Sequence, residues 1–131
     1  MVPIVFLSCE VAIAINEHQV RLFGGLKGIR DMNLLESALA RPQTMIGGVF
    51  MYPDLHTMAA VYAHGIIKNH PFFDGNKRTG MATALTFLNV NGHESILSSK
   101  DVVDIGVALA TAKLSYQELA MILKHSTILN V

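Results

Sequence analysis

A run of nine residues near the middle of the chain, His70 to Arg78, combines residue types that can bind phosphate and move a proton. It holds a titratable base, a carboxylate, a small-residue turn and two cations, and a helical pattern begins where it ends. A turn that leads into a helix offers unpaired backbone N–H groups and the positive end of the helix dipole, which together bind anions. The run therefore predicts a nucleotide site that carries its own base.

The first polar residues of the run suit acid–base and metal chemistry. His70 can accept a proton from an attacking hydroxyl, because an imidazole titrates near neutrality. Asp74 can hold Mg²⁺ beside a phosphate, and capping of the following helix is its plainer alternative. Gly75 allows the backbone to approach a ligand closely.

The last three residues of the run are expected to bind phosphate. Asn76 can donate through its amide, and Lys77 and Arg78 add two positive charges. The helix dipole disfavours cations at a helix N-terminus, so their placement indicates that they serve an anion. The alternative is a pair of solvated charges. The other five histidines lack such neighbours, and His64, on the preceding helix, is the weaker candidate for a place in the cleft.

About six helices are expected to position this run. Serine or aspartate at the starts, glycine or proline at the ends, and apolar residues three and four positions apart mark them. The expected N-caps are Ser8, Asp31, Asp54, Ser98 and Ser115, and the helix after the run extends from about Asn76 to Asn91. The fold class is therefore all-α, a compact bundle of about six helices with at most a minor β-strand pair or flap.

Three segments and one bend fall outside this pattern. Val2 to Leu7 and His93 to Leu97 are candidates for short strands that pair with each other. Gln43 to Pro53 has a Gly-Gly pair at its centre and predicts a hairpin or flap, which is expected near the site. Proline restricts the residue before it, so His70 is expected in extended geometry at a bend just past a helix.

Length and composition predict one domain, residues 1–131, with a substantial core. Half of the residues are apolar and the net charge is zero, which argues against disorder and against strong non-specific nucleic-acid binding. The single cysteine excludes an intrachain disulfide and a Cys-rich zinc site. No apolar run has the ~18 residues of a membrane span, and no positive segment precedes the apolar start. A cytoplasmic protein without membrane or direct nucleic-acid partners is expected.

The run resembles the signature of the Fic-domain superfamily, H-x-F-x-D/E-G-N-x-R-x-x-R, and six signature positions agree between His70 and Arg78. Phe23-Gly24-Gly25 and the segment 31–43 also resemble the death-on-curing, or Doc, branch, so that roughly residues 6–125 are covered. The fold implied by the resemblance is a compact helical bundle, in agreement with the helices expected above.

Two positions depart from the general signature. Position 77 is Lys where AMP-transferring Fic enzymes usually have Gly, and position 81 is Met where they have a second Arg. Both departures are typical of Doc-like toxins, in which ATP binds in a reversed sense and exposes its γ-phosphate. The resemblance thus implies a toxin kinase that phosphorylates a threonine of elongation factor Tu and stops translation.

The resemblance also implies roles for individual residues and for a partner. No Glu in this chain is followed by Gly or Asn, so the self-inhibitory motif of many Fic enzymes is absent. Restraint is therefore expected from an antitoxin whose disordered tail folds as a helix into a groove. The alternatives are a Fic-type AMP transferase and a Fic-like binding module without catalysis. The implied site consists of His70 as general base, Asp74 as Mg²⁺ ligand, and Gly75, Asn76, Lys77 and Arg78 as ATP-binding residues.

Overall fold

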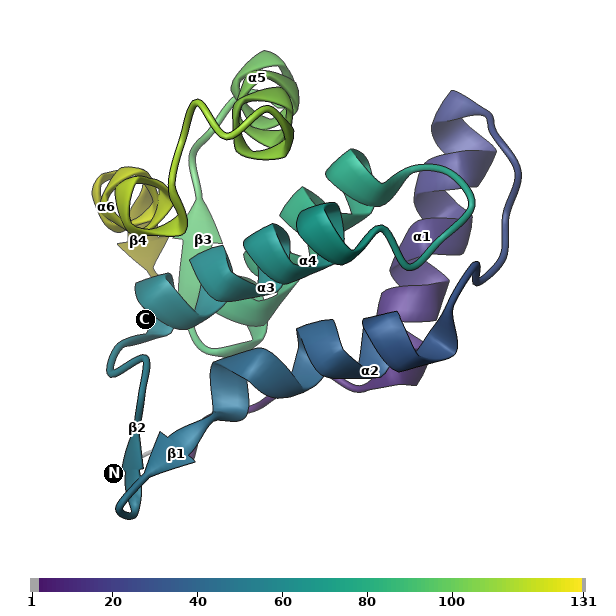
Figure 1. Ribbon diagram of the computed structural model, residues 1–131. Helices are drawn as coiled ribbons and strands as arrows, with labels where there is room; N and C mark the ends of the chain where they lie inside the picture. The colour runs from purple at the N-terminus through teal and green to yellow at the C-terminus, as the bar shows by residue number, and fades with distance from the viewer. Residues whose placement is uncertain (1–2, 131) are drawn as a thin grey trace.

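The computed structural model describes residues 3–130, and most of these residues lie in helices (Figure 1). Within this range, no helix is both long enough and apolar enough to cross a membrane. The expected all-α class with minor β structure is confirmed. The helices are α1 (Cys9–Phe23), α2 (Met32–Ala40), the 3-10 helix η1 (Arg41–Gln43), α3 (Leu55–Asn69), α4 (Asn76–Val90), α5 (Ser99–Ala110) and α6 (Tyr116–His125). The strands are β1 (Met45–Ile46), β2 (Val49–Phe50), β3 (His93–Ser95) and β4 (Thr127–Leu129).

Helix α3 lies at the centre of the fold and packs against α2, α4 and α6. Small residues let its neighbours approach closely. A Cβ on Gly65 of α3 would lie 3.3 Å from Ala38 of α2, and one on Gly80 of α4 would lie 2.8 Å from the Ile67 side chain. Helices α3 and α4 therefore form a tight helical hairpin, and the predicted site is the turn that connects them.

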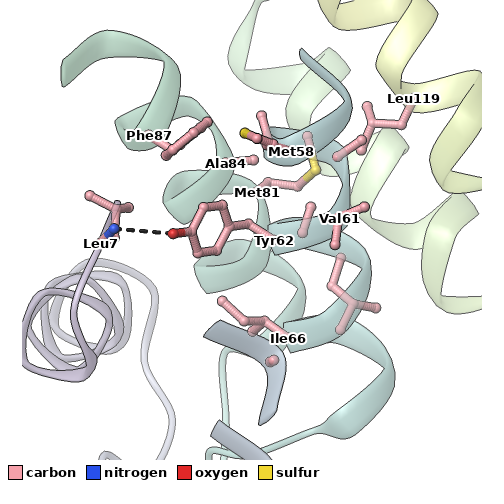
Figure 2. Packing of buried hydrophobic residues seen from close by; sticks show 14 of the residues in the cluster. Leu7, Met58, Val61, Tyr62, Ile66, Met81, Ala84, Phe87 and Leu119 are labelled. Atoms are coloured by element: carbon pink, nitrogen blue, oxygen red, sulfur yellow. Dashed lines mark hydrogen bonds between the residues drawn. The ribbon is translucent and has the colours of Figure 1, made fainter. Parts of the chain in front are cut away.

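The core between α3 and α4 also anchors the start of the described chain. Tyr62 is fully buried among apolar side chains, and its hydroxyl accepts a hydrogen bond from the Leu7 N–H at 3.1 Å (Figure 2). Asn91, which follows α4, accepts from the Val5 N–H and donates to the Val5 carbonyl. Side chains, and not a neighbouring strand, thus supply the hydrogen bonds of this backbone, and residues 3–7 form no helix or strand.

The predicted pairing of residues 93–97 with the N-terminal segment is wrong. β3 pairs antiparallel with β4, with Glu94 opposite Ile128, and the N-terminal segment takes no part. Val2, the first residue of the predicted strand, lies outside the described residues. The sequence pattern did not mark β4, because only three residues between α6 and the end of the described chain form it.

The predicted hairpin at residues 43–53 is present, but its expected place near the site is wrong. β1 and β2 pair around Gly47 and Gly48, both with positive φ. The hairpin lies at the N-terminal end of α3, whereas His70 follows the C-terminal end (Figure 1). Fifteen residues of helix separate the two ends by about 22 Å.

Candidate active site

His70 ends α3 and stands on the surface at the start of the predicted site. Its backbone is left-handed, with φ 53° and ψ 54°, so the expected extended geometry is wrong. The His70 N–H closes the last turn of α3 onto the Ile66 carbonyl at 3.0 Å. Many helices end at a residue in the left-handed conformation. At His70 this way of ending α3 outweighs the extended geometry that Pro71 favours.

Arg30 holds the backbone of His70 from the loop between α1 and α2. Its Nε donates to the His70 carbonyl at 2.7 Å, and its Nη2 donates to the Asn69 carbonyl at 3.0 Å. The last carbonyls of a helix lack partners within the helix, and the guanidinium fork supplies two donors at once. Arg30 therefore fixes the point from which the imidazole projects.

The same loop runs along the turn as a second layer of support. The N–H groups of Arg30 and Asp31 donate to the Pro71 carbonyl at 2.7 and 3.0 Å, and the Phe73 N–H donates to the Gly28 carbonyl at 3.1 Å. Phe72 is fully buried and anchors the turn in the core, while Phe73 is exposed. Hydrogen bonds between residues some forty positions apart in the sequence thus hold the backbone of the site in place.

Arg30→Gln tests this support. We expect the free energy of unfolding to fall by about 1 kcal/mol, because two charge-assisted hydrogen bonds at an exposed site are lost. We also expect the Cα chemical shift of His70 to move away from its left-handed value. Urea denaturation and NMR measure the two effects. Arg21→Gln, an exposed arginine of α1, serves as the control, and identical results for the two variants would contradict the role of Arg30.

Helix α4 begins without a side-chain cap. Its N-cap is Gly75, left-handed with φ 78°, and no side chain accepts a hydrogen bond from its first turn within the described chain. Each of the other five α-helices is capped as predicted, by Ser8, Asp31, Asp54, Ser98 or Ser115. The N–H groups at the start of α4 are therefore open to an external acceptor, as an anion site requires.

Asp74 is not the cap of α4. Its Oδ2 instead accepts a hydrogen bond from the Leu26 N–H at 2.6 Å, and within the described chain no hydrogen bond holds Oδ1. Among residues 3–130, no group of three or more His, Cys, Asp or Glu side chains gathers as a metal cluster. One carboxylate oxygen beside an open helix N-terminus fits Mg²⁺, which commonly takes its remaining ligands from phosphate and water.

Asn16 of α1 is a site residue that the sequence reasoning missed. It is buried, and its Nδ2 donates to the Asp74 carbonyl at 2.9 Å and to the Thr79 hydroxyl at 3.1 Å. The amide joins α1 to both sides of the turn. A signal was present, because Asn16 interrupts the buried stripe of α1 between Ala12 and Val20.

The side chain of Asn76 is used inside the turn. Its Oδ1 accepts from the Phe72 N–H and its Nδ2 donates to the Phe72 carbonyl, both at 3.0 Å. Because this pair is buried, the amide holds the turn closed. What Asn76 offers a phosphate in this arrangement is its backbone N–H in the first turn of α4.

Lys77 and Arg78 line a groove of about 830 Å³ between α1, α4 and α5. Within residues 3–130, neither cation has a carboxylate partner, and the one ion pair joins Lys100 and Asp104. The groove is large enough for a nucleotide, and its walls are mainly apolar. Residues that form the apolar walls include Leu22, Phe23, Leu85, Leu97, Val103 and Val107.

His64 is not a second base of this site. It is half-buried, and Arg41 Nη1 donates to its Nδ1 at 2.7 Å. Burial lowers the pKa of His64, and the positive charges of Arg41 and Lys68 lower it further. The neutral ring accepts a structural hydrogen bond where η1 meets α3.

A helical hairpin that places a histidine and an open helix N-terminus around one turn is the arrangement that the Fic signature implies. Residues 6–88 match the Fic/DOC family, and the chain belongs to this family. It is 31% identical to a protein named Protein kinase doc from Escherichia phage P1, over 91% of this chain and 93% of the relative. It is 49% identical to a protein named Toxin Doc from Mycolicibacterium smegmatis. That second match covers 53% of this chain and about half (54%) of the relative. The predicted resemblance to the Doc branch is confirmed.

Proposed function

We propose that this protein is a Doc-type toxin kinase that transfers the γ-phosphate of ATP to a protein hydroxyl. The observation that carries the proposal is the exposed His70 beside an uncapped helix N-terminus, with two cations that have no carboxylate partner among residues 3–130. The similarity to a relative named a protein kinase, over nearly the whole chain, supports it.

The proposed mechanism uses positioning and charge more than covalent chemistry. His70 takes the proton of the attacking hydroxyl as the new bond to phosphorus forms. The N–H groups of the first turn of α4, together with Lys77 and Arg78, hold the phosphates and stabilise the negative charge of the transition state. Mg²⁺, when bound, neutralises further phosphate charge, and Asp74 Oδ1 is the oxygen that would hold it.

Position 81 supports phosphate transfer over AMP transfer. Met81 is fully buried between α3 and α4 and lies near Tyr62 in the core (Figure 2). The general Fic signature has a second arginine at this position, which holds the terminal phosphates. A buried methionine supplies no charge there, so the ATP pose of AMP transferases loses one of its contacts. Lys77, exposed in the first turn of α4, stands where AMP-transferring Fic enzymes usually have a glycine. Its side chain would crowd the ATP pose that the glycine allows.

The target and the partner rest on the resemblance to the Doc branch. As target we propose a threonine of elongation factor Tu, whose phosphorylation would stop translation in the cytoplasm. As partner we propose an antitoxin whose disordered tail folds onto the toxin, because the chain carries no self-inhibitory Glu motif of its own.

Intact mass spectrometry tests the proposal. The purified protein is incubated with Mg²⁺-ATP and elongation factor Tu, and the factor is then weighed. We expect the mass of one phosphate group to be gained. A gain of one AMP instead would show that the argument from Lys77 and Met81 is wrong, and no gain at all would exclude this target.

A further inference from the structure

We propose that Phe23 is a positioning residue for Arg78, which holds the guanidinium in the orientation that binds phosphate. This inference rests on the proposed function. The Arg78 Cζ lies 3.8 Å from the centroid of the Phe23 ring. At this distance the carbon is in van der Waals contact with the ring, so the planar guanidinium lies against the ring face.

No ion pair or side-chain hydrogen bond in the described chain accounts for the place of this guanidinium. Within residues 3–130, Arg78 forms no ion pair, and none of the side-chain hydrogen bonds there involves it. The dipole of α4 disfavours a cation in the first turn. The aromatic ring is therefore the contact that restrains a long side chain in an unfavourable field.

A stacked guanidinium keeps its donors available. The ring covers one face of the group, while the N–H bonds point outward in its plane, where a phosphate can accept two of them. An arginine that is already restrained loses less rotamer freedom when the phosphate arrives. Phe23 thereby favours tight binding through its contact with the guanidinium.

Phe23 is poorly explained as a core residue. It is the last residue of α1 and 56% exposed. Three residues further along the chain, the Leu26 N–H holds the Asp74 carboxylate. The last residue of α1 and the loop that follows it therefore contact the phosphate-binding arginine and the proposed metal ligand, respectively.

The test is a double-mutant cycle on the affinity for Mg²⁺-ATP, measured by calorimetry. We expect Phe23→Leu to raise the Kd about three- to fivefold, because an unrestrained Arg78 must then lose its rotamer freedom on binding. Phe23→Tyr keeps an aromatic face and should stay within about twofold of wild type. In an Arg78→Gln background, Phe23→Leu should cause no further loss, because its effect passes through the guanidinium. Urea denaturation of each variant checks the fold.

NMR reports the stack without any nucleotide. The ring current of Phe23 should shift the Arg78 Hε signal upfield in wild type and Phe23→Tyr, and the shift should vanish in Phe23→Leu. An unchanged Kd for Phe23→Leu, or an equal loss in the Arg78→Gln background, overturns the positioning role and leaves the kinase proposal standing. Wild-type protein that does not bind Mg²⁺-ATP overturns both.

Discussion

The His70→Asn variant is expected to phosphorylate the proposed target, elongation factor Tu, about a hundredfold more slowly than wild type, or slower still, because it lacks the proposed general base. Asparagine is the sharpest replacement here. It tolerates the left-handed conformation that His70 adopts at the end of α3, so the backbone and its contact with Arg30 remain. The initial rate at saturating Mg²⁺-ATP measures the effect, and urea denaturation verifies that stability is unchanged.

Two comparisons make this result specific to the imidazole. His18→Asn, at an exposed position of α1, should leave the rate unchanged. His70→Ala removes the base and also strains the left-handed backbone, so it should lose stability as well as rate. A His70→Asn protein that keeps a tenth or more of the wild-type rate would exclude His70 as the base.

The Gly25→Ala variant is expected to lose about tenfold to a hundredfold in the same rate, because a small misplacement of a site group costs this much. A Cβ on Gly25 would lie 2.9 Å from the Asp74 Cβ, closer than real Cβ atoms approach one another. The carboxylate would have to move, and its hydrogen bond to the Leu26 N–H would break. The Mg²⁺ concentration that gives half of the maximal rate should rise together with this loss.

Gly24→Ala is the matched control for this variant. Gly24 also has a positive φ, 86° against 110° at Gly25, so both alanines carry backbone strain of about 1–3 kcal/mol. Nothing lies within 4 Å of a Cβ on Gly24. Both variants should therefore lose stability, and only Gly25→Ala should lose affinity for Mg²⁺. Equal losses of Mg²⁺ affinity would show that the contact with Asp74 is irrelevant.

The helices were predictable because their signals are local. A Ser or Asp cap binds an N–H three residues away, so Ser8, Asp54 and Ser115 announce a helix start from the sequence alone. The site motif is equally local, since the residues from His70 to Arg78 occupy one turn and the helix that follows it.

The contacts that hold this turn are distant in sequence and were missed. Arg30 lies 40 residues from the backbone that it binds, and Asn16 lies 58 residues from Asp74. Periodicity identifies a helix face but not the partner of that face. The hairpin was misplaced for a related reason, because nearness in sequence ignores the length of the helix between two segments.

The uncapped start of α4 also bears on how this protein can change over evolutionary time. Each of the other α-helices gains stability from its capping side chain, and the glycine cap of α4 forgoes roughly 0.3 kcal/mol of that gain. A mutation that placed a polar side chain of a neighbouring segment on these N–H groups would produce a more stable fold and a weaker phosphate site. Selection for stability and selection for activity therefore oppose each other at this helix end. Variants that carry such a mutation are expected to have a higher melting temperature than the wild-type protein.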